Sequence, residues 1–157
     1  MAPVALRGFE RALGGARRIG IDTAVMIYHL EDISPYSDLT THLLSLVAMR
    51  DVQLILSVIT VSEVLAGPWM SGRRDRAKTV EAVLVDLPGV VFAGVNLETA
   101  AKAAELRGRA KLPLSDALII ASAVQEGATV LVTNDTAWKG RSLPCRIVLL
   151  DDFARGA

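Results

Sequence analysis

Four acidic residues occupy positions where alternating strands and helices would bring them together. Asp22 and Asp135 follow short apolar runs, and Glu63 comes shortly after another such run. Asp116 stands directly before the apolar segment Ala-Leu-Ile-Ile. Four carboxylates without a neighbouring His or Cys are hard oxygen donors, which suit Mg²⁺ or Mn²⁺ better than Zn²⁺. Because a carboxylate-bound ion can orient and ionise a water for attack on phosphorus, the pattern predicts hydrolysis of a phosphodiester.

Each acid also has an ordinary structural interpretation. Thr60-x-x-Glu63 matches a helix capping box, Asp116 follows the good N-cap residue Ser115, and the two strand-end acids can close Asx-turns. These interpretations leave the crowding of four acids at one edge unexplained. Clustered carboxylates raise one another's pKa, and such a cluster usually persists only where a cation neutralises it.

The surrounding pattern predicts the elements that position these acids. Near-continuous apolar runs are typical of parallel strands covered on both faces, and they alternate with helical patterns. We therefore expect a three-layer α/β sandwich with about five parallel strands flanked by helices. Ligand crevices of such sheets lie at the carboxyl ends of the strands. The helix expected from Asp116 to Gln125 feeds the next strand, so its first turn should lie at this same edge. The runs are residues 19–21, 54–56, 90–92, 129–132 and 147–150.

Length and composition indicate one domain. The chain has 157 residues, with 17 Lys+Arg and 17 Asp+Glu, which argues against a protein that holds nucleic acid by bulk charge. We expect residues 1–17 to form a flexible basic arm and residues 18–157 a single domain. No apolar run approaches the roughly 20 residues of a membrane span. Because Cys145 is the only cysteine, no internal disulfide can form, and we expect a reducing, cytoplasmic location.

The neutral total hides an uneven distribution of charge. Residues 20–66 carry a net charge of −5 and residues 67–111 a net charge of +3. Arg107, Arg109 and Lys111 directly precede the segment that contains Asp116, so we expect them to border the acidic crevice and hold phosphates of a polyanionic substrate. The alternative is that they simply complement the dipole at the end of a helix.

Four segments resemble the motifs of PIN-domain ribonucleases, and most closely those of VapC-type toxins from bacterial toxin–antitoxin pairs. The resemblance covers about residues 18 to 152, and it implies a five-stranded parallel sheet and metal-dependent endoribonuclease activity with Mg²⁺ or Mn²⁺. The four segments are residues 21–31, 57–67, 114–123 and 131–135.

The resemblance also assigns roles to single residues. Asp22, Glu63, Asp116 and Asp135 correspond to the catalytic and metal-binding acids of the family, with Thr133 as a polar auxiliary. Many relatives carry a further acid and a Phe shortly after the fourth motif, at the places of Ala137 and Trp138. The alternative that Asn134 shares the role of Asp135 therefore stays open.

The resemblance further implies partners: an RNA substrate, with tRNA as the family-based expectation, a VapB-type antitoxin that inhibits the enzyme, and a homodimer. Two alternatives within the family are a catalytically silent PIN-like module that binds protein or RNA, and a housekeeping RNA-processing nuclease. A receiver-like signalling domain would need a Lys at the end of its last strand, where this chain has Leu149-Leu150-Asp151.

Overall fold

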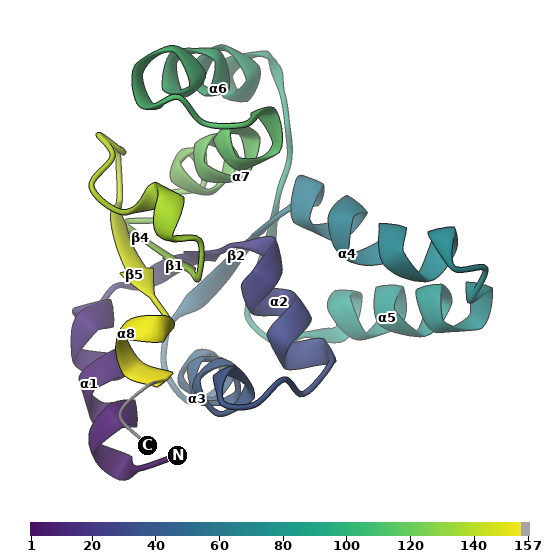
Figure 1. Cartoon of the computed structure of the whole chain (residues 1–157), viewed down its shortest axis with the longest axis vertical. Coiled ribbons are helices and arrows are strands. Elements are labelled where there is room, and N and C mark those ends of the chain that lie inside the picture. The colour runs from purple at the N-terminus through teal and green to yellow at the C-terminus, as the bar shows by residue number, and fades with distance from the viewer. Residues whose placement is uncertain (155–157) are drawn as a thin grey trace.

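The computed structural model describes residues 1–154 and contains a five-stranded parallel sheet in the order β3-β2-β1-β4-β5 (Figure 1). The predicted α/β sandwich with five parallel strands is therefore confirmed. The last three residues of the predicted domain, 155–157, lie outside the described residues. The strands are β1 (Arg18–Ile21), β2 (Gln53–Ser57), β3 (Val90–Ala93), β4 (Val130–Thr133) and β5 (Arg146–Leu149).

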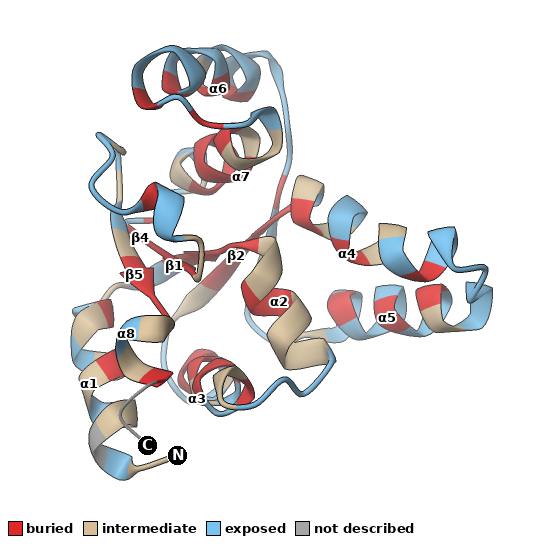
Figure 2. Ribbon diagram, viewed as in Figure 1, coloured by how far each residue is buried: buried red, intermediate tan, exposed pale blue. Residues whose placement is uncertain are grey.

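Helices cover both faces of the sheet and make a three-layer arrangement. One core packs α1, α2, α3 and α8 against the sheet, and a second core packs α6 and α7 against the opposite face. Burial is accordingly greatest in the strands and on the inner sides of the helices (Figure 2). The helices are α1 (Pro3–Leu13), α2 (Thr23–Leu30), α3 (Tyr36–Met49), α4 (Val58–Met70), α5 (Arg74–Asp86), α6 (Leu97–Ala110), α7 (Leu114–Gln125) and α8 (Asp151–Ala154), with a 3₁₀ turn, η1 (Thr136–Trp138).

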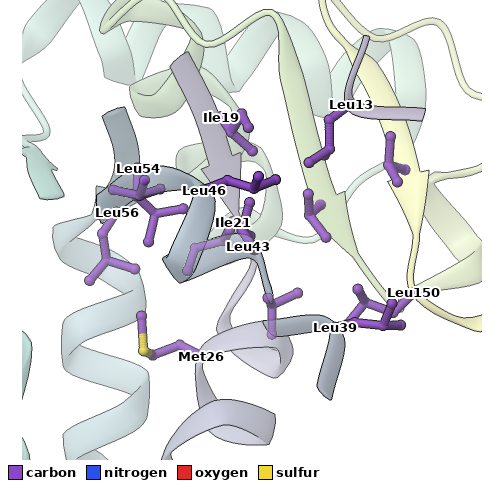
Figure 3. Close-up of a cluster of buried hydrophobic side chains, with 14 of the residues drawn as sticks. Leu13, Ile19, Ile21, Met26, Leu39, Leu43, Leu46, Leu54, Leu56 and Leu150 are labelled. Atoms are coloured by element: carbon purple, nitrogen blue, oxygen red, sulfur yellow. The ribbon is translucent and has the colours of Figure 1, made fainter. Parts of the chain in front are cut away.

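Alternate residues of the central strand β1 face the two opposite cores. Ile19 and Ile21 pack into the first core, among leucines of α3 and β2 (Figure 3). Gly20, between them, belongs to the opposite face, where a Cβ would come within 2.7 Å of a Leu131 methyl and 3.0 Å of Ala123 Cβ. The missing side chain lets α7 lie directly against the strand, which places the first turn of α7 beside the acidic edge.

The first residues of the chain form a helix rather than the flexible arm expected from the sequence. Phe9 and Leu13 of α1 are buried in the first core, and Phe9 meets Phe153 edge-on with ring centroids 5.6 Å apart. The Arg146 guanidinium donates two hydrogen bonds to carbonyl oxygens in the last turn of α1. The basic residues suggested an arm, but helical spacing places Phe9 and Leu13 on one face, and that face is covered by the core.

The α4–α5 pair reaches away from the sheet (Figure 1). The two helices pack along each other, with Val64 of α4 and Leu84 of α5 buried. Trp69 and Met70, at the far end of α4, are 48% and 87% exposed. Across residues 1–154, no helix is long and apolar enough to cross a membrane.

Candidate active site

Asp22 is held where two neighbouring strands end. It follows β1 and caps α2, and its backbone N–H donates to the carbonyl of Val132 on β4 at 3.0 Å. One carboxylate oxygen accepts from the backbone N–H of Thr23 at 2.7 Å, and the other from the Thr133 hydroxyl, also at 2.7 Å. Only 8% of Asp22 is exposed, so its orientation is fixed by both β1 and β4.

The environment of Asp22 disfavours its charge. Burial is the largest effect, and it raises the pKa of Asp22 to about 6 from an ordinary value of 3.8. The hydrogen bonds from Thr133 and Thr23 lower the pKa, whereas the negative charges of Asp116 and Asp135 raise it further. A cation near this carboxylate would therefore be stabilised by it and would favour the ionised form.

Glu63 lies opposite Asp22 and is linked to it through Thr23. The Thr23 hydroxyl donates to a Glu63 carboxylate oxygen at 2.5 Å and lies 3.3 Å from the Thr60 hydroxyl. The N-cap of α4 is Ser57, which accepts from the backbone N–H of Ile59. Glu63 is therefore in the second turn of α4, and the capping-box interpretation of Thr60-x-x-Glu63 does not describe it.

Asp116 lies in the first turn of α7, where Pro113 rather than Ser115 is the N-cap residue. The indole Nε1–H of Trp138 donates to a carboxylate oxygen of Asp116 at 3.0 Å, and Trp138 is only 1% exposed. Burial raises the pKa of Asp116, the Trp138 hydrogen bond lowers it, and the charges of Asp135 and Glu63 raise it again. Asp116 is thus within electrostatic range of three other acids, Asp135, Glu63 and Asp22.

The neighbours Asp135 and Asn134 face different surroundings. Asp135 accepts from the backbone N–H of Ala137 at 2.8 Å, which is the turn-closing role considered for it, and its charge also reaches Asp22 and Asp116. The Asn134 side chain instead accepts from the backbone N–H of Asp151 at 2.9 Å and so joins β4 to α8. Of these two candidates, Asp135 is therefore the one whose charge affects Asp22 and Asp116.

The four predicted acids are therefore brought together from four separate elements, at the carboxyl ends of the strands. In residues 1–154, however, no three acidic, histidine or cysteine side chains stand close enough together to hold one metal ion. The donors suit Mg²⁺ or Mn²⁺ in kind, because they are carboxylates with adjacent hydroxyls. Burial is the main cause of the raised pKa values of Asp22 and Asp116, and the neighbouring acids add to it, so a bound cation would favour their ionised forms.

Two residues that contact the acids were not singled out as site residues by the sequence. Thr23 bridges Asp22 and Glu63, and its only signal was that it directly follows an acid at a strand end. Trp138 supports Asp116, and its signal was the departure from the family's usual Phe at that place. A hydrogen bond from an indole across 22 positions of sequence depends on the fold and has no local pattern.

The predicted RNA-binding residues lie at the end of α6. Arg107, Arg109 and Lys111 are all exposed, and Arg109 lies 3.3 Å from Glu105. Lys111 ends the helix in a left-handed conformation, with φ of 55°. Arg109 lines a cleft beside the acids, together with Lys139 and Arg141. Arg107 and Lys111 do not line this cleft.

The fold and its edge define an α/β protein that carries a carboxylate cluster where parallel strands end. The family model of the PIN domain matches residues 19–141, so the chain belongs to the PIN-domain family. Helix α1 precedes the matched region. No curated protein matched the sequence.

Solved structures with the same fold come from toxin–antitoxin systems. VapBC2 from Rickettsia felis, bound to a promoter DNA fragment, superposes with a TM-score of 0.66 at 18% identity, over 83% of this chain and 97% of that one. DNA-bound VapBC from Salmonella typhimurium gives 0.64 at 18% identity, over 85% and 98%. Mycobacterium tuberculosis VapC20, a sarcin-ricin loop cleaving toxin, gives 0.57 at 19% identity, over 82% and 98%. At these identities the similarity shows the fold.

Proposed function

We propose that this protein is a Mg²⁺- or Mn²⁺-dependent endoribonuclease of the VapC type. The observation that carries the proposal is the convergence of Asp22, Glu63, Asp116 and Asp135 from four elements of a PIN-family fold. Carboxylates so placed raise one another's pKa, as the influence of Asp116 and Asp135 on Asp22 illustrates. A cluster of this kind is stable when it holds a divalent cation.

The acids have separate roles in this proposal. Asp22, Glu63 and Asp116 would hold the ion, and Asp135 would support a second ion or its waters. A bound ion would supply Lewis acidity toward the phosphodiester and favour ionisation of a nearby water. Thr133 keeps the Asp22 carboxylate turned toward β4, and Thr23 keeps Glu63 turned toward Asp22. These hydroxyls fix the acids before substrate arrives.

RNA is the proposed substrate class. Support comes from family membership and from VapC20, whose structure is that of a toxin that cleaves the sarcin-ricin loop. Among RNAs, we propose tRNA as the substrate, on the basis of the family. With aromatic residues making up only 4% of the chain, base stacking offers little surface, and recognition would depend on backbone shape and charge.

The proposal includes a protein inhibitor and a second copy of the chain. Two of the solved structures with this fold are VapBC complexes, so we propose a VapB-type antitoxin as a partner, together with a homodimer. RNA and antitoxin would both be met in the cytoplasm, where we place the protein. A short reading frame for a DNA-binding antitoxin beside this gene would favour a toxin over a housekeeping nuclease.

Removal of one carboxylate charge tests the proposed activity. Asp116→Asn should lower RNA cleavage in Mn²⁺ or Mg²⁺ by at least about 100-fold, because a ligand charge is lost while the size is kept. EDTA should abolish cleavage by the wild type. The measurement is the initial rate on a labelled RNA, resolved on a denaturing gel.

Asp75→Asn is the matched control. Asp75 is also in the first turn of a helix, α5, but it is exposed there, so the variant should cleave at the wild-type rate. Cleavage that survives both Asp116→Asn and EDTA would contradict the metal-dependent mechanism. Absence of cleavage by the wild type on structured and unstructured RNAs with either metal would favour the silent binding module.

A further inference from the structure

A polar cleft of about 510 Å³ opens beside the acidic cluster. Its walls come from the end of α6 and from the segment between β4 and β5, which lie next to each other in Figure 1. Three of the lining residues, Arg109, Lys139 and Arg141, are cationic, and across residues 1–154 no acidic residue lines the cleft. The hollow is therefore positively charged although the protein as a whole is neutral.

The cleft and the acids share one short segment of chain. Thr136 and Ala137 line the cleft, while the backbone N–H of Ala137 binds Asp135. The next residue, Trp138, donates to Asp116. A nucleic-acid strand with one phosphate at the acids would therefore have its neighbouring phosphates within reach of the cleft.

The three cations are held so that an anion can approach them. The Arg141 guanidinium donates to the carbonyl oxygens of Ala137 at 2.6 Å and Ala110 at 2.5 Å, so its charge is positioned by backbone. Arg109 and Lys139 have carboxylate neighbours 3.3 and 3.5 Å away, but both pairs are largely exposed. Exposed pairs of this kind contribute about 0–1 kcal/mol and exchange readily for another anion.

We propose that this cleft binds a backbone phosphate of the RNA strand next to the bond that is cut, with Lys139 and Arg109 as the main contacts and Arg141 fixing the loop. The inference rests on the proposed function, whose acidic centre would otherwise repel a polyanion. Guanidinium and ammonium groups are the side chains that position phosphates without reading the base. The cleft would thus hold the strand at a defined distance from the acids, whatever the sequence.

The salt dependence of RNA binding tests this inference. A labelled single-stranded RNA oligonucleotide is titrated with Asp116→Asn protein over a series of salt concentrations, and fluorescence anisotropy gives Kd. Adding Lys139→Gln should weaken binding about fivefold near 0.1 M salt. It should also reduce the slope of log K against log salt by about 0.7, the value for one phosphate contact on a single strand. Adding Arg109→Gln as well should roughly double the change in slope.

Arg7→Gln in the same background is the control, since it removes one exposed positive charge from α1 and should change neither Kd nor slope. Kd and slope unchanged in the double cleft variant would overturn the inference. If the wild type does not cleave RNA but Lys139→Gln reduces the slope, the proposed activity is rejected and phosphate binding in the cleft is retained. If the wild type cleaves RNA but Lys139→Gln leaves the slope unchanged, the proposed phosphate site in the cleft is rejected and the proposed activity is retained.

Discussion

Three of the four carboxylates accept a hydrogen bond from a different element of the fold. Thr133 of β4 donates to Asp22, Thr23 of α2 donates to Glu63, and the indole of Trp138 in η1 donates to Asp116. Such partners fix the orientation of a metal ligand and strongly affect metal affinity. Trp138 is the most distinctive of them, because a Phe at this place could fill the space but has no N–H to donate.

Replacing only this N–H is a test at the level of single residues. Trp138→Phe keeps an aromatic ring in the buried position and should weaken Mn²⁺ binding about tenfold, because Asp116 loses the group that orients it. Isothermal titration with Mn²⁺ measures Kd directly, and circular dichroism confirms that the variant is folded. Trp69→Phe makes the same substitution at an exposed site and should bind like the wild type. Equal Mn²⁺ affinities for the two variants would show that Trp138 does not position Asp116.

At the scale of elements, the acids meet because of the direction in which strands and helices run. β1 and β4 are parallel neighbours, so the residues after them emerge at one edge, and α7 runs back so that its first turn reaches the same edge. Gly20 permits this placement, because a side chain there would collide with Leu131 and approach Ala123 of α7 too closely.

Helix α1 should be an integral part of the folded unit although it precedes the region matched by the PIN family. Phe9→Ala removes a fully buried ring and should lower the free energy of unfolding by about 3–5 kcal/mol. Urea unfolding followed by circular dichroism measures the change. Arg7→Ala, at an exposed position of the same helix, should change it by no more than about 0.5 kcal/mol. A loss below about 1 kcal/mol for Phe9→Ala would mean that α1 contributes little to the stability of the domain.

At the scale of the whole molecule, a neutral chain separates its charges. The acidic cluster gathers at the ends of the strands, and the cationic cleft lies directly beside it. Neutrality excludes a protein that holds nucleic acid by bulk charge, yet it is compatible with local recognition. Within the acidic cluster, Asp22 is buried and has a raised pKa, so its negative charge lowers the stability of the folded protein.

Asp22 should make the metal-free protein less stable as the pH rises. Its pKa in the folded protein, about 6, lies above the ordinary 3.8, so the folded state favours the protonated form. The contribution of Asp22 to stability is therefore fully present below about pH 4 and is lost as the pH rises through about 6. A shift of about two units corresponds to about 3 kcal/mol. Asp22→Asn cannot ionise, so in EDTA it should be more stable than the wild type near pH 7.5, as measured by urea unfolding.

Divalent metal should largely cancel this difference in stability between the two proteins. Near pH 7.5, Mn²⁺ at about 100 times its Kd should stabilise the wild type by about 2.7 kcal/mol, and the gain should be much smaller in Asp22→Asn. An equal gain in both proteins would mean that the ion binds elsewhere. Equal stability of the two proteins in EDTA from about pH 4 to 7.5 would contradict the raised pKa of Asp22.

Local patterns were sufficient for the fold but not for every detail of the site. Apolar runs located the five strands, and the alternation with helices implied that they are parallel. The basic composition of residues 1–17 suggested a free arm, whereas burial of Phe9 depends on the matching surface of distant elements. Asn134 and Asp135 are adjacent polar residues, and the sequence does not show that the first binds the backbone of α8 whereas the second faces the other acids.

The amino-acid sequence was sufficient to predict the class of fold, because hydrophobic period is a property of short segments. It also led to the proposal that four acids meet at one edge of the sheet. Tertiary structure decided which groups orient those acids and where the cations gather. Thr23 reaches Glu63, Trp138 reaches Asp116, and Arg141 binds the end of α6. Each of these contacts joins residues far apart in the chain, so its existence depends on packing of the whole molecule.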